Sequence, residues 1–190
     1  MNVTEAIEAR HATRAYDDRV VDEWVVESLL HAACQAPTAM DEHPLIFSVV
    51  QDRERLRRWS DRAKSILLAR VGAEAKAGPY AVRLADPKFN VFYDAGTLVV
   101  IGARSPGPYA EADCWLAAEN LMLAACEHGL GTCVVGSATA ALSAPDIKQE
   151  LAFPPLAVVI APIILGYPRK APAAEASAPP RADPRVLSWY

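Results

Sequence analysis

Apolar side chains recur along the chain with the spacing of amphipathic helices in four segments. In one of them Asp22 is a typical N-cap residue, and Val25, Leu29 and Ala33 follow at intervals of four, which predicts a helix with one buried face. This helix should end before Pro37, because proline disfavours helical backbone at the residue that precedes it. The same kind of pattern predicts helices over residues 3–10, over 53–77 as one or two helices, and over 111–131.

Short apolar runs alternate with these helices and predict strands. They cover residues 45–50, 95–103, 132–136 and 156–168. Pro162 lies inside the last run and has no N–H to donate, so we expect a bulge or an edge position there. Helices and strands that alternate in this way predict an α+β or α/β sandwich with a sheet of about four or five strands.

Two segments have no clear periodicity. Residues 83–94 are interpreted either as a lid-like loop or as an irregular connection. Residues 169–190 are rich in proline and alanine, which predicts an extended arm. The arm ends in the apolar side chains Leu187, Trp189 and Tyr190, and we expect these to pack against another surface.

Length and composition narrow the class of protein. A chain of 190 residues is long enough to bury a core without a disulfide or a structural cofactor. We find no internal repeat and predict a single domain over residues 1–190, with an extended C-terminal arm at 171–190. The net charge of -4 argues against a nucleic-acid partner. The hydrophobic share of 52% leaves apolar side chains available for a subunit interface.

The N-terminus and the cysteines predict a cytoplasmic protein. The first residues contain no apolar core of signal-peptide length, and no apolar run reaches the ~20 residues that a membrane-spanning helix requires. Cys34, Cys114, Cys126 and Cys133 do not have the spacing of a zinc site and are expected to be reduced thiols. We therefore expect neither a membrane partner nor a bound metal.

The segment RHATR offers candidate chemistry near the N-terminus. Arg10 and Arg14 are four residues apart, so they share one side if this turn is helical, and Thr13 adds a hydroxyl beside them. Two guanidinium groups and a hydroxyl suit a phosphate group. The alternative is a solvated basic helix end that interacts only with the helix dipole.

The segment APTAMDEHP lies between a predicted helix and a predicted strand. It provides backbone amides around Thr38 and Ala39, together with the carboxylate of Asp41 and the imidazole of His43. It lacks the glycines of a dinucleotide-binding loop. Asp41 and His43 have the chemistry of a hydrolase acid/base pair, but the chain has no recognisable nucleophile motif. The segment is otherwise interpreted as a polar loop that bonds its own backbone.

Several motifs follow one another in an order that resembles the nitroreductase family, the homodimeric FMN-dependent NAD(P)H oxidoreductases. They are RHATRAY, APTAMDEHPLIF, AAENLMLAACEHGLGTCVVG, ILGYP and a basic, proline-rich tail. The resemblance covers nearly the whole chain. It implies an α+β fold, a three-layer sandwich in which helices flank a mixed, mostly antiparallel sheet of about five strands, with an extended C-terminal arm.

The resemblance assigns the phosphate end of FMN to the first motif. Arg10 and Arg14 should hold the phosphate or the ribityl chain, and His11 and Thr13 should assist through backbone or side chain. A basic residue of the tail should return to the same phosphate. Three tail residues are candidates for this role, namely Arg181, which aligns best, Arg169 and Lys170.

The isoalloxazine ring is assigned to two other segments. By the resemblance Pro37, Thr38, Ala39 and Met40 line the ring, commonly from the partner subunit, so FMN would lie at the interface of a homodimer. Val135 and Gly136 correspond to the position where a backbone N–H faces flavin N5.

Three residues depart from the family pattern within the ring-lining segment. Asp41 replaces an asparagine, His43 a glutamine and Leu45 a tryptophan. An ionised aspartate only accepts hydrogen bonds and would repel an anionic reduced flavin. Our hypothesis is that Asp41, if it faces the ring, lowers the flavin potential or is held protonated. The midpoint potential of Asp41→Asn would decide this.

The implied chemistry is hydride transfer from NADH or NADPH to flavin N5, and then to a small electrophile such as a nitroaromatic or a quinone, in a ping-pong cycle. The cofactor performs the redox step, so no catalytic side chain is required. A specialised relative, such as a reductive dehalogenase or a flavin-fragmenting enzyme, is the first alternative. The second is an FMN-binding or interaction protein with little turnover.

Overall fold

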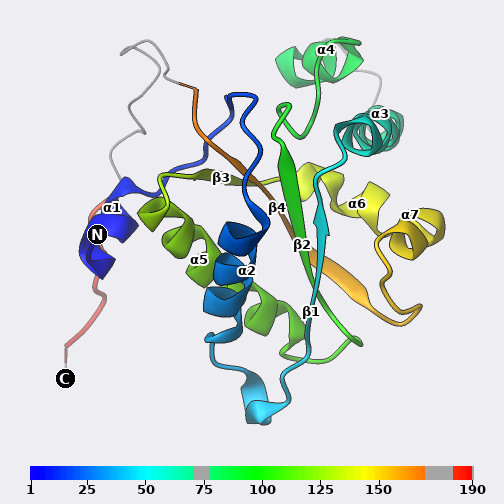
Figure 1. Ribbon diagram of the computed structural model, residues 1–190. Helices are drawn as coiled ribbons and strands as arrows, with labels where there is room; N and C mark the ends of the chain where they lie inside the picture. Colours follow the sequence, from blue (N-terminus) through cyan, green and yellow to red (C-terminus); the bar gives the residue numbers. More distant parts are fainter. Residues whose placement is uncertain (71–77, 170–181, 190) are drawn as a thin grey trace.

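The computed structural model describes residues 1–70, 78–169 and 182–189, and within them one antiparallel sheet forms the centre of the molecule (Figure 1). Its strands are arranged in the order β1 (Leu45–Val50), β2 (Thr97–Ala103), β4 (Val158–Gly166) and β3 (Gly131–Val134). The helices are α1 (Val3–Ala9), α2 (Glu23–Cys34), α3 (Arg53–Arg70), α4 (Pro79–Ala85), α5 (Ala110–Glu127), α6 (Thr139–Leu142) and α7 (Pro145–Glu150), and η1 (Ala39–Asp41) and η3 (Gly136–Ala138) are short 3-10 helices.

The sheet separates two hydrophobic cores. Along β2, Leu98 and Val100 point into one core, while Val99 and Ile101 point into the other, as the alternation of side chains in a strand requires. Helices α2 and α5 cover the second face, and α3, α4, α6 and α7 contribute to the core on the first (Figure 1). The predicted α+β three-layer sandwich is therefore confirmed.

The sheet has fewer strands than the sequence led us to expect. About five strands were predicted, and the described residues form four. Two isolated bridges add to it, a parallel one between Ala12 and Thr132 and an antiparallel one between Tyr16 and Pro168. Residues 12–16 thus run beside β3 and the end of β4 without becoming a strand, because only single bridges connect them to the sheet.

Pro162 lies in an interior strand rather than at an edge. β4 pairs with both β2 and β3, and the bulge falls nearby, where the register shifts between Ile101 and Gly102. The carbonyl of Pro162 accepts a hydrogen bond from the Val135 N–H, just past the end of β3. In a strand, the N–H and the C=O of one residue point toward the same neighbouring strand. The position where Pro162 lacks an N–H therefore faces the residues just past the end of β3, where the ladder has stopped, and the proline costs no ladder bond.

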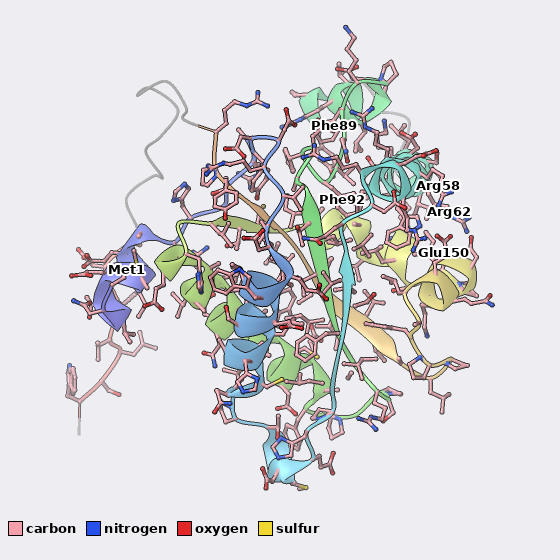
Figure 2. All side chains as sticks on the ribbon, in the orientation of Figure 1. Met1, Arg58, Arg62, Phe89, Phe92 and Glu150 are labelled. Carbon is pink, nitrogen blue, oxygen red and sulfur yellow. The ribbon has the colours of Figure 1, made fainter. Side chains whose placement is uncertain are left out.

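Residues 83–94, which have no clear periodicity in the sequence, begin in α4 and continue as a packed connection. Residues 86–94 form turns after α4, and the side chains of Val91 and Phe92 are buried in the core. The Val91 N–H donates to the Ser60 hydroxyl of α3 at 2.9 Å. Figure 2 shows Phe89 and Phe92 on this connection, between α4 and β2. The interpretation as an irregular connection is therefore the better one for residues 86–94.

The C-terminal arm is extended where the structure describes it. Residues 182–189 have no regular secondary structure. The side chains of Leu187 and Trp189 are 85% and 88% exposed in the single chain, so the expected packing surface is not provided by the described part of the same chain. Tyr190 lies outside the described residues. Among those residues, no helix combines the length and the apolar character needed to cross a membrane.

Candidate functional site

The N-terminal arginine segment is held against β3 by backbone hydrogen bonds. Helix α1 ends at Ala9, and its C-cap residue Arg10 still donates its N–H to the Ala6 carbonyl. The chain then becomes extended, and the Thr13 N–H donates to the Thr132 carbonyl at 2.9 Å. The buried hydroxyl of Tyr16 donates to the Thr13 carbonyl at 2.6 Å, and burial raises the pKa of this phenol above its ordinary value. The segment is thus attached to the sheet on both sides of Arg14.

Arg10 and Arg14 flank the bridge between Ala12 and Thr132, next to the buried Cys133 of β3. Burial raises the pKa of this thiol, and the positive charges of Arg14 and Arg10 partly oppose the shift. Arg10 also forms an ion pair of 3.4 Å with Glu119 of α5, and the Arg14 guanidinium lies 5.9 Å from the ring centroid of Tyr93. The structure therefore brings the two predicted arginines together at one end of the sheet.

His11 and Thr13 lie in different environments. His11 is exposed, and its Nδ1–H donates to the Ala9 carbonyl at 2.9 Å. The Thr13 side chain is buried, and its hydroxyl has no hydrogen-bond partner among the residues that the structure describes. An ideal Cβ on Gly131 would lie only 2.5 Å from the Thr13 Oγ1. Thr13 therefore positions the segment through its backbone and its packing, with its side chain turned inward.

The chain that follows β3 leaves open space at a glycine. The Val135 N–H is used by the carbonyl of Pro162 at 2.8 Å, and Gly136 begins η3. A Cβ added to Gly136 would meet no atom of the described residues within 4 Å, and Gly136 is exposed. Of these two positions, Gly136 is the one with room for a ligand beside its backbone.

The loop between α2 and β1 contains unusual backbone. Met40, Asp41 and His43 all have left-handed backbone, with φ values of 54°, 57° and 46°. This conformation costs a non-glycine residue on the order of 1 kcal/mol or more. The loop is held by the Ala39 N–H, which donates to the buried carboxylate of Asp113 at 3.1 Å. Such strain is typical of functional segments. The side chain of Met40 in this loop is 82% exposed.

Asp41 and His43 form an exposed pair in this loop. The His43 Nε2 and the Asp41 Oδ1 are 2.9 Å apart, and the His43 N–H donates to the Thr38 hydroxyl at 3.3 Å. As far as the structure describes the chain, neither side chain bonds to a serine or a cysteine. The pair therefore lacks the nucleophile that a hydrolase of this type would need.

The two groups of predicted residues lie at opposite ends of α5. Ala39 contacts Asp113 in the first turn of α5, whereas the Thr13 N–H donates to the carbonyl of Thr132, which follows the last turn of α5. The 18 residues of α5 rise by about 27 Å. Figure 1 shows η1 at the bottom of the molecule and the segment after α1 at the top. One chain alone therefore does not bring the two groups together.

The tail is described only at its beginning and its end. Arg169 is used structurally, since its N–H donates to Ala15 and its Nη2 to the Tyr16 carbonyl, each at 3.0 Å. Lys170 and Arg181 lie outside the described residues. The described parts of the chain contain no cluster of three or more side chains that could hold a metal ion.

Sequence reasoning missed a cluster of aromatic and basic residues beside Arg14. The Arg83 guanidinium of α4 lies 4.4 Å from the ring centroid of Phe89 and 5.3 Å from that of Tyr93. Tyr93 is also the ring over which Arg14 lies. The only signal in the sequence is the mixture of basic and aromatic residues in the aperiodic segment after residue 82, and contacts between segments cannot be read from it.

The comparisons with known proteins agree on one family. The family model described as the nitroreductase family matches residues 7–167. A Methanothermobacter thermautotrophicus protein named "Putative NADH dehydrogenase/NAD(P)H nitroreductase" is 31% identical over 172 residues, which cover 90% of this chain and 80% of that protein. An Archaeoglobus fulgidus protein of the same name is 31% identical over 164 residues, covering 86% and 83%.

Solved structures share the same fold. A nitroreductase with bound FMN from Bacteroides fragilis superimposes with a TM-score of 0.77 at 24% identity, covering 100% of this chain and 98% of that one. An iodotyrosine deiodinase bound to FMN and 3-iodo-L-tyrosine gives 0.74 at 20% identity and covers 100% of both chains. The matching sequence model, the curated relatives and the architecture agree, and this chain belongs to the nitroreductase family.

Proposed function

We propose that this protein is an FMN-dependent oxidoreductase, a single domain over residues 1–190 that takes hydride from NADH or NADPH and reduces a small electrophile, such as a nitroaromatic or a quinone, in a ping-pong cycle. The observation that carries the proposal is the position of Arg10 and Arg14, which flank the bridge between Ala12 and Thr132 at the end of β3. Family membership and the names of the relatives support the same activity.

The chemistry of the residues around β3 fits the phosphate end of FMN. Guanidinium groups bind phosphate through charge-assisted, bidentate hydrogen bonds, and Arg14 has no carboxylate partner among the described residues. Arg10 shares its charge with Glu119 at 3.4 Å and would contribute less. The open space beside Gly136 suits the close approach of a flat ring to backbone.

The loop 37–43 fits the ring end only if it comes from a second chain. In one chain it lies at the opposite end of α5 from Arg14, and Met40 is largely exposed. A homodimer related by two-fold symmetry would bring the loop of each chain to the β3 end of its partner. The exposed apolar residues of the arm are also available for such an interface.

When bound, FMN supplies the hydride chemistry, and the side chains of this protein orient and retain the cofactor. Thr13 and Tyr16 position the arginine segment against β3. Asp41 is a carboxylate at a ring-lining position, and its pairing with His43 at 2.9 Å gives it a partner that is cationic when protonated. The pair would thus moderate the repulsion that a lone carboxylate would exert on a reduced flavin.

The decisive experiment is cofactor analysis followed by turnover. We expect a yellow protein whose released chromophore is FMN, and which oxidises NADH or NADPH when menadione or a nitroaromatic is added. Arg14→Ala should weaken FMN binding about tenfold or more. Arg58→Ala is the matched control, because Arg58 lies on α3 in an exposed ion pair with Glu150.

Each alternative gives a different result. A protein that binds FMN but does not oxidise NAD(P)H with any acceptor would be a flavin-binding module. A colourless protein that cannot be reconstituted with FMN would refute the proposal. Halogenated phenols belong in the acceptor panel, because they test the dehalogenase alternative directly.

A further inference from the structure

Two arginines from distant parts of the chain share one aromatic ring. The guanidinium carbons of Arg14 and Arg83 lie 5.9 Å and 5.3 Å from the ring centroid of Tyr93. Arg83 belongs to α4 and is further supported by Phe89, whose ring centroid lies 4.4 Å away. Contacts with aromatic rings orient a guanidinium plane, and the N–H groups at its edge still donate to other partners.

These two arginines differ from most others in the structure. The arginines that form ion pairs with carboxylates are Arg10, Arg19, Arg53, Arg55, Arg57, Arg58 and Arg62. Within residues 1–70, 78–169 and 182–189, neither Arg14 nor Arg83 has a carboxylate oxygen within 4.0 Å. A nearby carboxylate, Asp94, is instead paired with Arg57 and bonded to Asn90. The guanidinium groups of Arg14 and Arg83 thus both contact the Tyr93 ring, and neither is paired with a carboxylate of the described residues.

An anion bound between these groups would relieve their repulsion. Two like charges on one ring repel each other, although solvent screens exposed groups. A phosphate monoester carries close to two negative charges and has three terminal oxygens, so it can accept bidentate hydrogen bonds from two guanidinium groups at once. Arg14 already belongs to the proposed phosphate end of the site, and the shared ring places Arg83 beside it.

We propose that Arg83 is a second phosphate-binding residue, which acts with Arg14 beside Tyr93 to hold a phosphate monoester. The phosphate belongs either to FMN or to the ribose 2′-phosphate of NADPH, and the first source rests on the proposed function. In both cases Arg83 distinguishes a phosphorylated ligand from the same ligand without its phosphate.

The test compares pairs of ligands that differ only by this phosphate. Wild-type protein, Arg83→Gln and the control Arg58→Gln are titrated with FMN and riboflavin, and their FMN-loaded forms with NADP⁺ and NAD⁺. If the phosphate is that of FMN, Arg83→Gln lowers the FMN-to-riboflavin affinity ratio about tenfold. If it is that of NADPH, the NADP⁺-to-NAD⁺ ratio falls by a similar factor instead. The control keeps both ratios.

Two further measurements keep the proposal falsifiable. Arg83→Lys retains the charge without the planar fork and should give ratios between those of wild type and Arg83→Gln. Inorganic phosphate, added to the FMN-free full chain at constant ionic strength, should raise the Tm of wild type and Arg58→Gln more than that of Arg83→Gln. This last comparison still decides on Arg83 if the wild-type protein binds no FMN, a result that would refute only the proposed function. Equal ratios and equal Tm shifts in all variants would overturn the role of Arg83.

Discussion

At the scale of single residues, the contact between Thr13 and Gly131 determines how closely the arginine segment approaches β3. An ideal Cβ on Gly131 would lie 2.5 Å from the Thr13 Oγ1 and 2.7 Å from its Cβ and Cγ2. Only glycine leaves room for the short side chain of Thr13 here, while the Thr13 N–H donates to Thr132. The phosphate end of the proposed site therefore depends on a missing side chain as well as on charges.

We predict that Gly131→Ala destabilises the protein by roughly 1–3 kcal/mol, the range for overpacking a close-packed contact. Denaturant unfolding measures the change. Gly107→Ala is the control, because its Cβ would make only an ordinary contact of 3.9 Å with Ala110. Replacing Thr13 by Ala in the Gly131→Ala background should recover part of the loss, since it removes two of the three close atoms, Oγ1 and Cγ2, and leaves only the Cβ. Equal stability of Gly131→Ala and Gly107→Ala would contradict the steric argument.

The candidate residues could be predicted from the sequence only where the reason is local. Arg10 and Arg14 were assigned to one side on the assumption of a helical turn, but the chain is extended after the α1 C-cap at Arg10. A spacing of four also brings two residues of an extended chain to the same side, because side chains alternate with a period of two. Arg83 could not be predicted, since its contact with Tyr93 depends on how the turns of residues 86–94 bring that ring back to α4.

At the scale of elements, helix α1 is short and relies on its cap. It has seven residues, of which only Ala6 is buried. The Asn2 side chain accepts from the Glu5 N–H, and the Glu5 carboxylate accepts from the Asn2 N–H, each at 2.9 Å. Packing contributes little to so short a helix, so this capping box supplies much of its local stability. The helix matters to the site because it leads directly into Arg10.

We expect Asn2→Ala to destabilise α1 by about 1 kcal/mol, within the 0.5–2 kcal/mol measured for lost N-caps. Faster amide hydrogen exchange in residues 5–10 would report this local fraying. Thr4→Ala changes an exposed residue of the same helix, which makes no side-chain hydrogen bond in the described structure, and alanine favours helix at that position. Exchange rates that are the same in Asn2→Ala and Thr4→Ala would show that the cap is unimportant.

Most elements were predictable because their signals are local, and the exceptions have physical reasons. The buried strands follow from continuous apolar runs, and α2 begins after Asp22 and ends before Pro37 as expected. Helices α6 and α7 have four and six residues, too few to establish a helical period in the sequence. Pro162 was expected at an edge or a bulge, but the short length of β3 makes an interior position possible.

At the scale of the whole molecule, the sequence could predict the layers but not where each part of the site lies. Alternating apolar runs and amphipathic helices are sufficient to predict a sandwich. The loop 37–43 contacts the first turn of α5 and β3 follows its last turn, so most of this 18-residue helix, about 27 Å long in all, lies between the two groups. If the loop 37–43 and the β3 end bind the same FMN, as we propose, the site requires a second chain.

This requirement predicts that two defective chains can complement each other. Arg10→Ala combined with Arg14→Ala removes the phosphate end, and Met40→Glu adds a repelling carboxylate to the other end at a largely exposed position, so each homodimer should lose FMN. When both chains are co-expressed, random pairing makes half of the dimers mixed, and each mixed dimer has one intact and one doubly defective site. Roughly a quarter of the wild-type FMN content should therefore return. FMN content that stays at the level of the separate variants would mean that each site is built within one chain.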